Sequence, residues 1–112
     1  MNPEELLKAT VNALEDRKAK EINVIDVRGK SNVADYVVIA TGTSSRHTSS
    51  TAEHVALELK RVAFPAQGIE GKRGGEWVLV DFGDVVVHVM KQETRDFYQL
   101  DELWEMIASE SI

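Results

Sequence analysis

The sequence predicts one small α/β domain over residues 1–112, with a mixed β-sheet flanked by helices. Segments with helical and with strand spacing of apolar residues alternate along the chain, as in α/β folds. Tyr36–Ala40 is an unbroken apolar run, which is typical of a strand buried on both faces. Glu76–Met90 has the pattern of two strands joined by a tight turn. No repeat or linker marks a second domain.

Composition narrows the class of partner. Thirteen Lys and Arg against nineteen Asp and Glu leave a net charge of −6, and cysteine is absent. Phosphate contacts need clustered cations, so an acidic domain is a poor candidate for bare nucleic acid and a better one for a basic protein. The sequence also has no run of about 18 apolar residues and no signal-peptide pattern, so we expect a cytoplasmic protein that does not enter membranes.

The first part of the chain predicts a helix and two strands. Asn2 can cap a helix that has Pro3 at its first position and runs to about Lys18. The apolar stripe of this helix is core packing and consists of Leu6, Leu7, Thr10, Val11 and Leu14. Strands follow at Glu21–Arg28 and Asp35–Thr41, and the unbroken apolar run of the second predicts the middle of the sheet.

The segment Gly42–Thr51 is rich in small and hydroxyl residues and leads into a helix from about His47 to Ala63. A strand, a small-residue turn and a helix N-terminus in that order can bind an anion. Ser and Thr are also the preferred caps of any helix, so capping is the favoured interpretation. Pro65 ends the helix, and Ile69-Glu70 can form a short edge strand before the hairpin.

The hairpin has two different faces if Gly83-Asp84 is its turn. One face is aliphatic apart from one ring and carries Val78, Val80, Phe82, Val85, Val87 and Val89. The other face is mixed and carries Trp77, Leu79, Asp81, Val86, His88 and Met90. Either a helix of the same chain or a partner can cover such a mixed face, and both alternatives stay open. After the hairpin, a short turn through Tyr98 precedes a last helix, in which the apolar residues at helical spacing are Leu100, Leu103, Trp104 and Ile107.

The residues that could perform chemistry do not form a catalytic or metal-binding set. His47 and His54 lack companions at metal-ligand spacing, so surface positions are the favoured interpretation. His88 shares a face with Asp81 but has no Ser or Cys nucleophile beside it, which favours a structural or partner-facing role. Asp101-Glu102 lie in the first turn of the last helix, where acids complement the helix dipole. We expect no metal and no cofactor.

Four stretches resemble a known family, in the same order and over nearly the whole chain. They are ADYVVIATGTS at 34–44, EG at 70–71, WVLVDFGDVVVHVM at 77–90 and RDFYQLDELW at 95–104. These stretches are similar to the ribosomal silencing factor family, also called RsfS or Iojap-like proteins. The pattern D-x-G-D-x-V-V-H followed by R-x-F-Y-x-L-x-x-L-W is long enough to make the resemblance specific.

The resemblance implies a fold related to nucleotidyltransferases and a function without catalysis. Family members bind protein fourteen of the large ribosomal subunit where the small subunit would dock, prevent the subunits from joining, and lower translation when nutrients are short. Carried onto this chain, the resemblance marks Trp77, Asp81, Gly83, Asp84, His88, Arg95, Phe97, Tyr98, Leu100, Leu103 and Trp104. Phe97, Leu103 and Trp104 can instead close the core, and for Trp104 this alternative is preferred.

We therefore hypothesise that the mixed hairpin face, extended by the start of the last helix, docks on this ribosomal protein. Its aromatic and Met content is that of an interface centre. The expected contact residues are Trp77, Leu79, Asp81, Gly83, Asp84, His88, Met90, Arg95, Phe97, Tyr98 and Leu100. A homodimer through the same face is plausible when no ribosome is present.

The alternative function is nucleotidyl transfer. Gly42-Thr43-Ser44 loosely resembles the Gly-Ser turn of those enzymes. Such enzymes need an Asp-x-Asp pair, about ten residues further on, to hold the metal ions that bridge the triphosphate. The first acid after Ser44 is Glu53, which stands alone, so this alternative is disfavoured.

Overall fold

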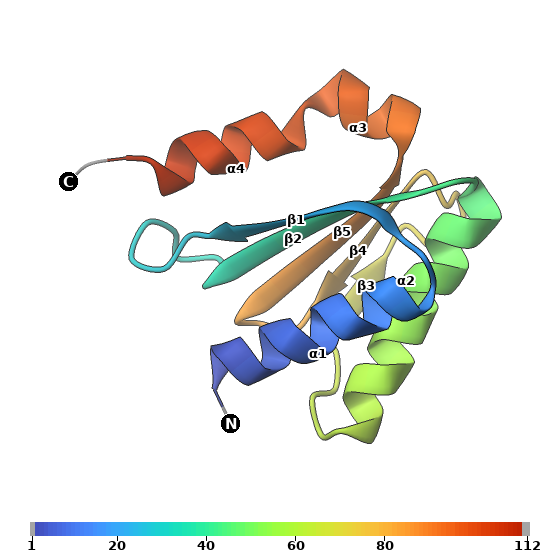
Figure 1. Ribbon diagram of the computed structural model, residues 1–112, viewed down its shortest axis with the longest axis horizontal. Coiled ribbons are helices and arrows are strands. Elements are labelled where there is room, and N and C mark those ends of the chain that lie inside the picture. Colours follow the sequence, from blue (N-terminus) through green and yellow to red (C-terminus); the bar gives the residue numbers. More distant parts are fainter. Residues whose placement is uncertain (1, 111–112) are drawn as a thin grey trace.

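The computed structural model describes residues 2–110, which form a five-stranded mixed sheet with helices on both faces (Figure 1). The predicted α/β class and the predicted order of elements are confirmed. In chain order the elements are α1 (Pro3–Asp16), β1 (Lys20–Asp26), β2 (Tyr36–Gly42), α2 (Ser45–Arg61), β3 (Gly68–Glu70), β4 (Trp77–Asp81), β5 (Val85–Lys91), α3 (Gln92–Tyr98) and α4 (Leu100–Ala108).

β4 and β5 form the predicted hairpin in the predicted register. The Cα partners are Trp77 with Met90, Leu79 with His88, Val80 with Val87 and Asp81 with Val86. At the turn, Gly83 has a φ of +86°, a left-handed value that glycine adopts without a steric penalty. The Gly83 N–H donates to Asp81 Oδ1 at 2.8 Å, which braces the turn. This register places the aliphatic and the mixed sets of side chains on opposite faces of the sheet.

The middle strand of the sheet is β5, so the prediction that Asp35–Thr41 provides it is wrong. The strand order is β1-β2-β5-β4-β3, with β2 antiparallel to β1 and parallel to β5. Every residue of β2 is buried, and so is every residue of β5 except Lys91. An unbroken apolar run indicates burial on both faces, and two adjacent strands satisfy that condition here. The run therefore identifies an interior strand without saying which interior strand is central.

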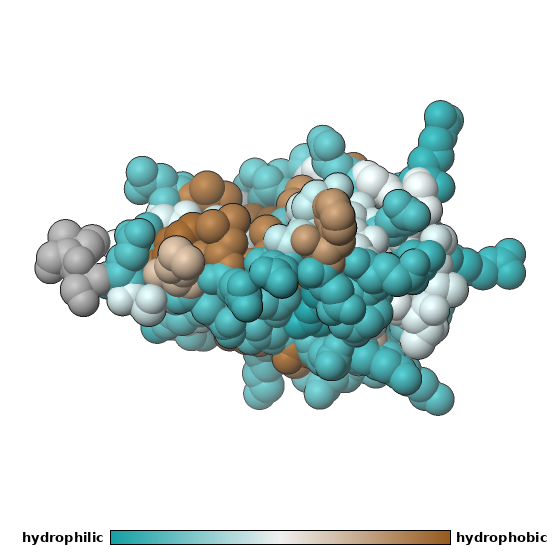
Figure 2. Space-filling view, turned by 90° about the horizontal axis from the view of Figure 1, so that it is seen from above, coloured by the Kyte–Doolittle hydropathy of each residue, from teal (hydrophilic) through white to brown (hydrophobic). Residues whose placement is uncertain are grey.

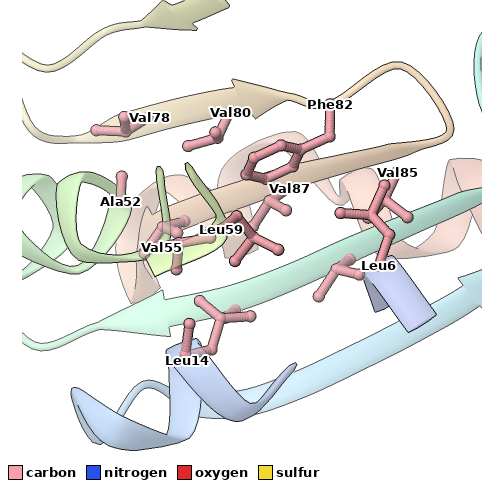
Figure 3. Close-up of a cluster of buried hydrophobic side chains, with 14 of the residues drawn as sticks. Leu6, Leu14, Ala52, Val55, Leu59, Val78, Val80, Phe82, Val85 and Val87 are labelled. Atoms are coloured by element: carbon pink, nitrogen blue, oxygen red, sulfur yellow. The ribbon is translucent and has the colours of Figure 1, made fainter. Parts of the chain in front are cut away.

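The main core lies between the sheet and the helices α1 and α2 (Figures 1 and 3). Leu6 and Leu14 of α1 and Leu59 of α2 are buried against the sheet. The aliphatic hairpin face lies in this core as predicted, with Val78, Val80, Phe82, Val85, Val87 and Val89. Asn2 caps α1 as expected, because its Oδ1 accepts the N–H of Glu5 at 2.8 Å.

A second, smaller core lies on the opposite face, under α3 and α4 (Figure 1). Its buried members come from three strands and from the residue directly after β1, and are Ile25, Val27, Val37, Ile39 and Met90. Leu100 and Trp104 of α4 pack against this cluster and are only partly buried. The mixed hairpin face is thus covered in part by helices of the same chain, and part of it remains open.

Replacing Leu59 by alanine tests the main core. Leu59 is completely buried, so Leu59→Ala should lower the free energy of unfolding by about 2 to 5 kcal/mol. Leu57 lies on the same helix and is 61% exposed, so Leu57→Ala should change it by less than about 0.5 kcal/mol. Urea denaturation followed by circular dichroism measures both values. Equal effects of the two substitutions would contradict this packing.

Candidate functional site

The helices α3 and α4 carry an exposed apolar ridge. Gln99 separates them, with φ +49° and ψ +46°, so α4 starts in a new direction. Figure 2 looks down on this side of the molecule and shows brown apolar side chains along the helices, surrounded by teal hydrophilic ones. We call this surface the α3–α4 ridge and define it by its exposed side chains, which are Phe97, Tyr98, Leu103 and Met106.

The exposure of the ridge decides between the alternatives left open for its residues. Phe97 is 80% exposed and Leu103 is 52% exposed, so neither closes the core. Trp104 is partly buried against the second core, as preferred. Met106 was not among the expected site residues and is 65% exposed. Its spacing of three residues from Leu103 was the signal that could have revealed it.

An aromatic stack connects the exposed ridge to the sheet. The Phe97 and Tyr98 rings meet edge to face, with centroids 4.9 Å apart. Tyr98 lies against Trp77 of β4, with centroids 5.1 Å apart. Gly71, with φ +88°, lies directly against the Trp77 carbonyl group, where a Cβ atom would clash. The EG pair seen in the sequence therefore lets the backbone approach the first residue of β4 closely.

His88 supports this stack from beneath. Its Nδ1 accepts the Trp77 Nε1–H at 3.0 Å, so the proton of the neutral ring is on Nε2. Burial lowers the pKa of His88 to about 4, and the nearby Asp101 carboxylate opposes the shift. His88 is therefore neutral at pH 7. With only 6% of its surface exposed, it acts on the ridge through Trp77.

The expectation that Met90 belongs to a contact surface is wrong. Met90 is completely buried in the second core, because α3 and α4 cover the end of β5 that carries it. Leu100 is also partly covered in the same cluster. Both side chains hold the ridge on the sheet from below.

Arg95, expected at the contact surface, instead ties α3 and α4 to the sheet. Its guanidinium forms a two-pronged pair with Asp101, with Nε–Oδ1 at 2.9 Å and Nη2–Oδ2 at 2.7 Å. Its Nη1 also donates to the Glu21 carbonyl oxygen at 2.9 Å and to Thr41 Oγ1 at 2.8 Å. These internal partners use most of the N–H donors of Arg95. Its side chain is only 10% exposed.

Asp101 is the main partner of Arg95. From the sequence, its only expected role is to complement the helix dipole. It lies in the first turn of α4 as expected. The hydrogen bonds from Arg95 hold its pKa below the usual range, helped by the Asn23 amide at 2.9 Å. No spacing rule could have paired Arg95 with Asp101, because the left-handed Gln99 between them interrupts the helix.

The remaining expected residues lie toward the other end of the hairpin. Leu79 and Asp81 of β4 are half-buried, and Asp84 in the turn is exposed. The Asp84 carbonyl oxygen accepts the N–H groups of Asp35 and Tyr36 at 2.8 and 3.1 Å, so the turn also positions the start of β2. By the register, this turn and the Trp77 end of the hairpin are at opposite ends of the strands. The structure thus divides the expected set into an aromatic group and a turn group.

The segment Gly42–Thr51 performs the predicted capping. Ser44 Oγ accepts the His47 N–H at 3.0 Å at the start of α2. His47 is half-buried at the surface, and both of its ring nitrogens have partners. Nδ1 accepts the Thr43 N–H at 2.9 Å, and Nε2 donates to the Arg17 carbonyl oxygen at 2.7 Å. His47 thereby joins the β2–α2 turn to the end of α1.

Between residues 2 and 110, no three His, Asp or Glu side chains come together as potential metal ligands. No helix in that same range is long and apolar enough to cross a membrane.

The fold and the ridge define a small α/β domain with a surface of interface composition. The chain matches the family described as "RsfS: Ribosomal silencing factor during starvation" over residues 1–111. The chain belongs to the ribosomal silencing factor family, as the resemblance of its motifs implied.

Several relatives agree with this assignment. The chain is 42% identical over 103 residues to ribosomal silencing factor RsfS of Zymomonas mobilis, covering 92% of this chain and 77% of that one. It is 37% identical over 99 residues to "Mitochondrial assembly of ribosomal large subunit protein 1" of Mus musculus, covering 86% of this chain and 43% of the mouse protein.

Solved structures show the same fold. A protein of Chromobacterium violaceum superposes with a TM-score of 0.91 at 41% identity, covering 93% of this chain and 87% of that one. A protein of Bacillus halodurans gives a TM-score of 0.82 at 34% identity, covering 90% of this chain and 94% of that one.

The buried His88 predicts a pH dependence of stability. Its pKa is about 4 when folded and 6.5 when exposed, so the unfolded chain binds the proton more tightly. The contribution of the neutral His88 to the free energy of unfolding should be fully present above pH 6.5. The free energy of unfolding should fall by about 3 kcal/mol as the pH drops to 4. His88→Gln, which keeps an acceptor for Trp77, should remove this decline. Urea titrations between pH 7 and 4.5 measure the difference, and parallel curves for both proteins would contradict it.

Removing the Arg95 guanidinium should loosen α4. Arg95→Ala leaves a partly buried carboxylate without its main partner and should cost about 2 kcal/mol of stability. Amide hydrogen exchange should increase in α4 in particular. Arg61→Ala is the matched control, because the Arg61 side chain is 69% exposed and its pair with Glu58 contributes about 0.5 kcal/mol or less. Unchanged exchange in α4 of Arg95→Ala would show that other contacts hold the ridge.

Proposed function

We propose that this chain binds the large ribosomal subunit through its protein fourteen, on the surface where the small subunit docks. Occupying that surface blocks joining of the subunits and lowers translation when nutrients are short. The proposal builds on membership of the ribosomal silencing factor family. Binding alone accounts for the effect, which takes place in the cytoplasm and requires no reaction.

The observation that carries the proposal is the exposed aromatic pair of the α3–α4 ridge. Phe97 and Tyr98 expose 80% and 56% of their surface although each can bury a large apolar area. Aromatic residues on a fixed support lose little conformational freedom on binding and are enriched among the anchors of interfaces. Trp77 and His88 provide this support beneath Tyr98.

Charge supports the choice of partner. The chain has a net charge of −6, which attracts a basic ribosomal protein and speeds the encounter. Next to the ridge, Asp96 and Glu102 are exposed acids that can lie at the rim of the contact. Leu79, Asp81 and Asp84 of the hairpin extend the contact along β4.

The same ridge is the surface we propose for a homodimer of the free protein. A second copy would cover Phe97 and Tyr98 when no ribosome is present. Because one surface would serve both partners, the dimer would dissociate when the protein binds the ribosome.

Truncating the ridge tests the proposal. Phe97→Ala should weaken binding to isolated large subunits by about 2 kcal/mol, which is about 30-fold, with folding intact because Phe97 is exposed. Leu57→Ala removes another exposed apolar side chain, on the other side of the sheet, and should leave binding unchanged. Co-sedimentation with separated subunits measures both affinities.

The activity itself is measured by mixing small and large subunits with and without the wild-type protein. The protein should migrate with the large subunit only and reduce the yield of joined ribosomes. Equal yields of joined ribosomes at saturating protein would overturn the proposed function.

A further inference from the structure

A cationic hollow lies at one end of the sheet, and none of the ridge residues lines it. It has a volume of about 440 Å³ and is lined by Asp16, Arg17, Lys18, Lys20, Thr43 and His47. Two of its three cations, Arg17 and Lys18, lie in the connection between α1 and β1, the third, Lys20, begins β1, and all three are exposed. Arg46, also exposed, precedes His47 in the first turn of α2.

The backbone of this hollow is fixed by hydrogen bonds. His47 Nε2 donates to the Arg17 carbonyl oxygen at 2.7 Å, which holds the α1–β1 connection against the start of α2. Lys18 follows α1 and adopts a left-handed φ of +58°. Glycine is the usual residue with this conformation after a helix. A lysine in this conformation carries a steric penalty. A strained backbone position therefore carries a cationic side chain here.

The cations of the hollow are free of acidic partners within the described part of the chain. Arg17, Lys18 and Lys20 form no ion pair there, and Arg17 donates only to Ser50 Oγ at 3.3 Å. The one carboxylate in the lining, Asp16, lies 3.5 Å from His54. In a chain of net charge −6, this leaves a local excess of positive charge.

The hollow is at the same end of the molecule as α3. Lys20 of β1 pairs with Thr41 of β2, and Gly42 pairs with Lys91 of β5, directly before α3. Figure 1 shows the end of α1, the start of α2 and α3 at one end of the sheet. A large partner that contacts α3 is therefore close to the hollow as well.

We infer that the cationic hollow binds the phosphate backbone of RNA in the large ribosomal subunit, beside the protein contact made by the ridge. This inference rests on the proposed function for the identity of the subunit. The chemistry fits, because Lys and Arg side chains and the Thr43 hydroxyl group are donors that contact phosphate oxygens. Such contacts are independent of base sequence and strongly dependent on salt.

The test compares two pairs of substitutions with the same change in charge. Lys18→Gln with Lys20→Gln removes cations of the hollow, and Lys8→Gln with Lys60→Gln removes exposed cations elsewhere. Affinity for whole large subunits and for isolated protein fourteen is measured for both variants and the wild type over a salt series. Circular dichroism confirms that both variants fold.

Loss of the two hollow cations should weaken binding to the large subunit about tenfold at low salt. The slope of log affinity against log salt should fall by about 0.7 to 0.9 for each lost contact. Binding to isolated protein fourteen and the behaviour of the control pair should match the wild type. Equal loss toward protein fourteen would mean that the hollow contacts protein, and this overturns the inference.

Equal affinity of all three proteins for the large subunit also overturns the inference and leaves the proposed function intact. If the wild type binds the large subunit but not protein fourteen, the proposed partner is wrong. The comparison of the two variants on the large subunit still decides the role of the hollow in that case.

Discussion

The structure depends on the need to cover two adjacent parallel strands on both faces. β2 and β5 are apolar and buried almost throughout, so each side of the sheet must carry helices. On one side α1 and α2 supply long amphipathic helices and close the main core. On the other side, residues 2–110 supply only α3 and α4, of seven and nine residues. These short helices bury Met90 and Ile39, and they leave their own outer apolar side chains in solvent.

The exposed ridge follows from how α3 and α4 are attached. Arg95 donates hydrogen bonds to Asp101, to Thr41 and to the Glu21 carbonyl group. These bonds fix the two helices on the sheet. The left-handed Gln99 ends α3 directly after Phe97 and Tyr98, which are both exposed. Residues of one sequence motif thus have two different roles. Arg95 and Leu100 hold the helices, and Phe97 and Tyr98 present the surface.

The distribution of charge fits the two contacts that we propose, one to protein and one to RNA. The chain as a whole is acidic, which suits a basic ribosomal protein. The exception is the cationic hollow at the carboxyl end of β2, where three cations lack acidic partners in the region that the structure describes. Net charge by itself argued against contact with nucleic acid, because it averages over surfaces that a large partner meets separately.

The sequence by itself determined the class of fold, the hairpin register and the family. These depend on local patterns, namely the alternation of apolar residues, the Gly83 turn and contiguous motifs. Only the tertiary structure decided that β5 is central, that Met90 is buried and that Arg95 pairs with Asp101. Each of these depends on which segments lie next to one another across the sheet. Long-range pairing of this kind has no fixed spacing along the chain, so periodicity cannot reveal it.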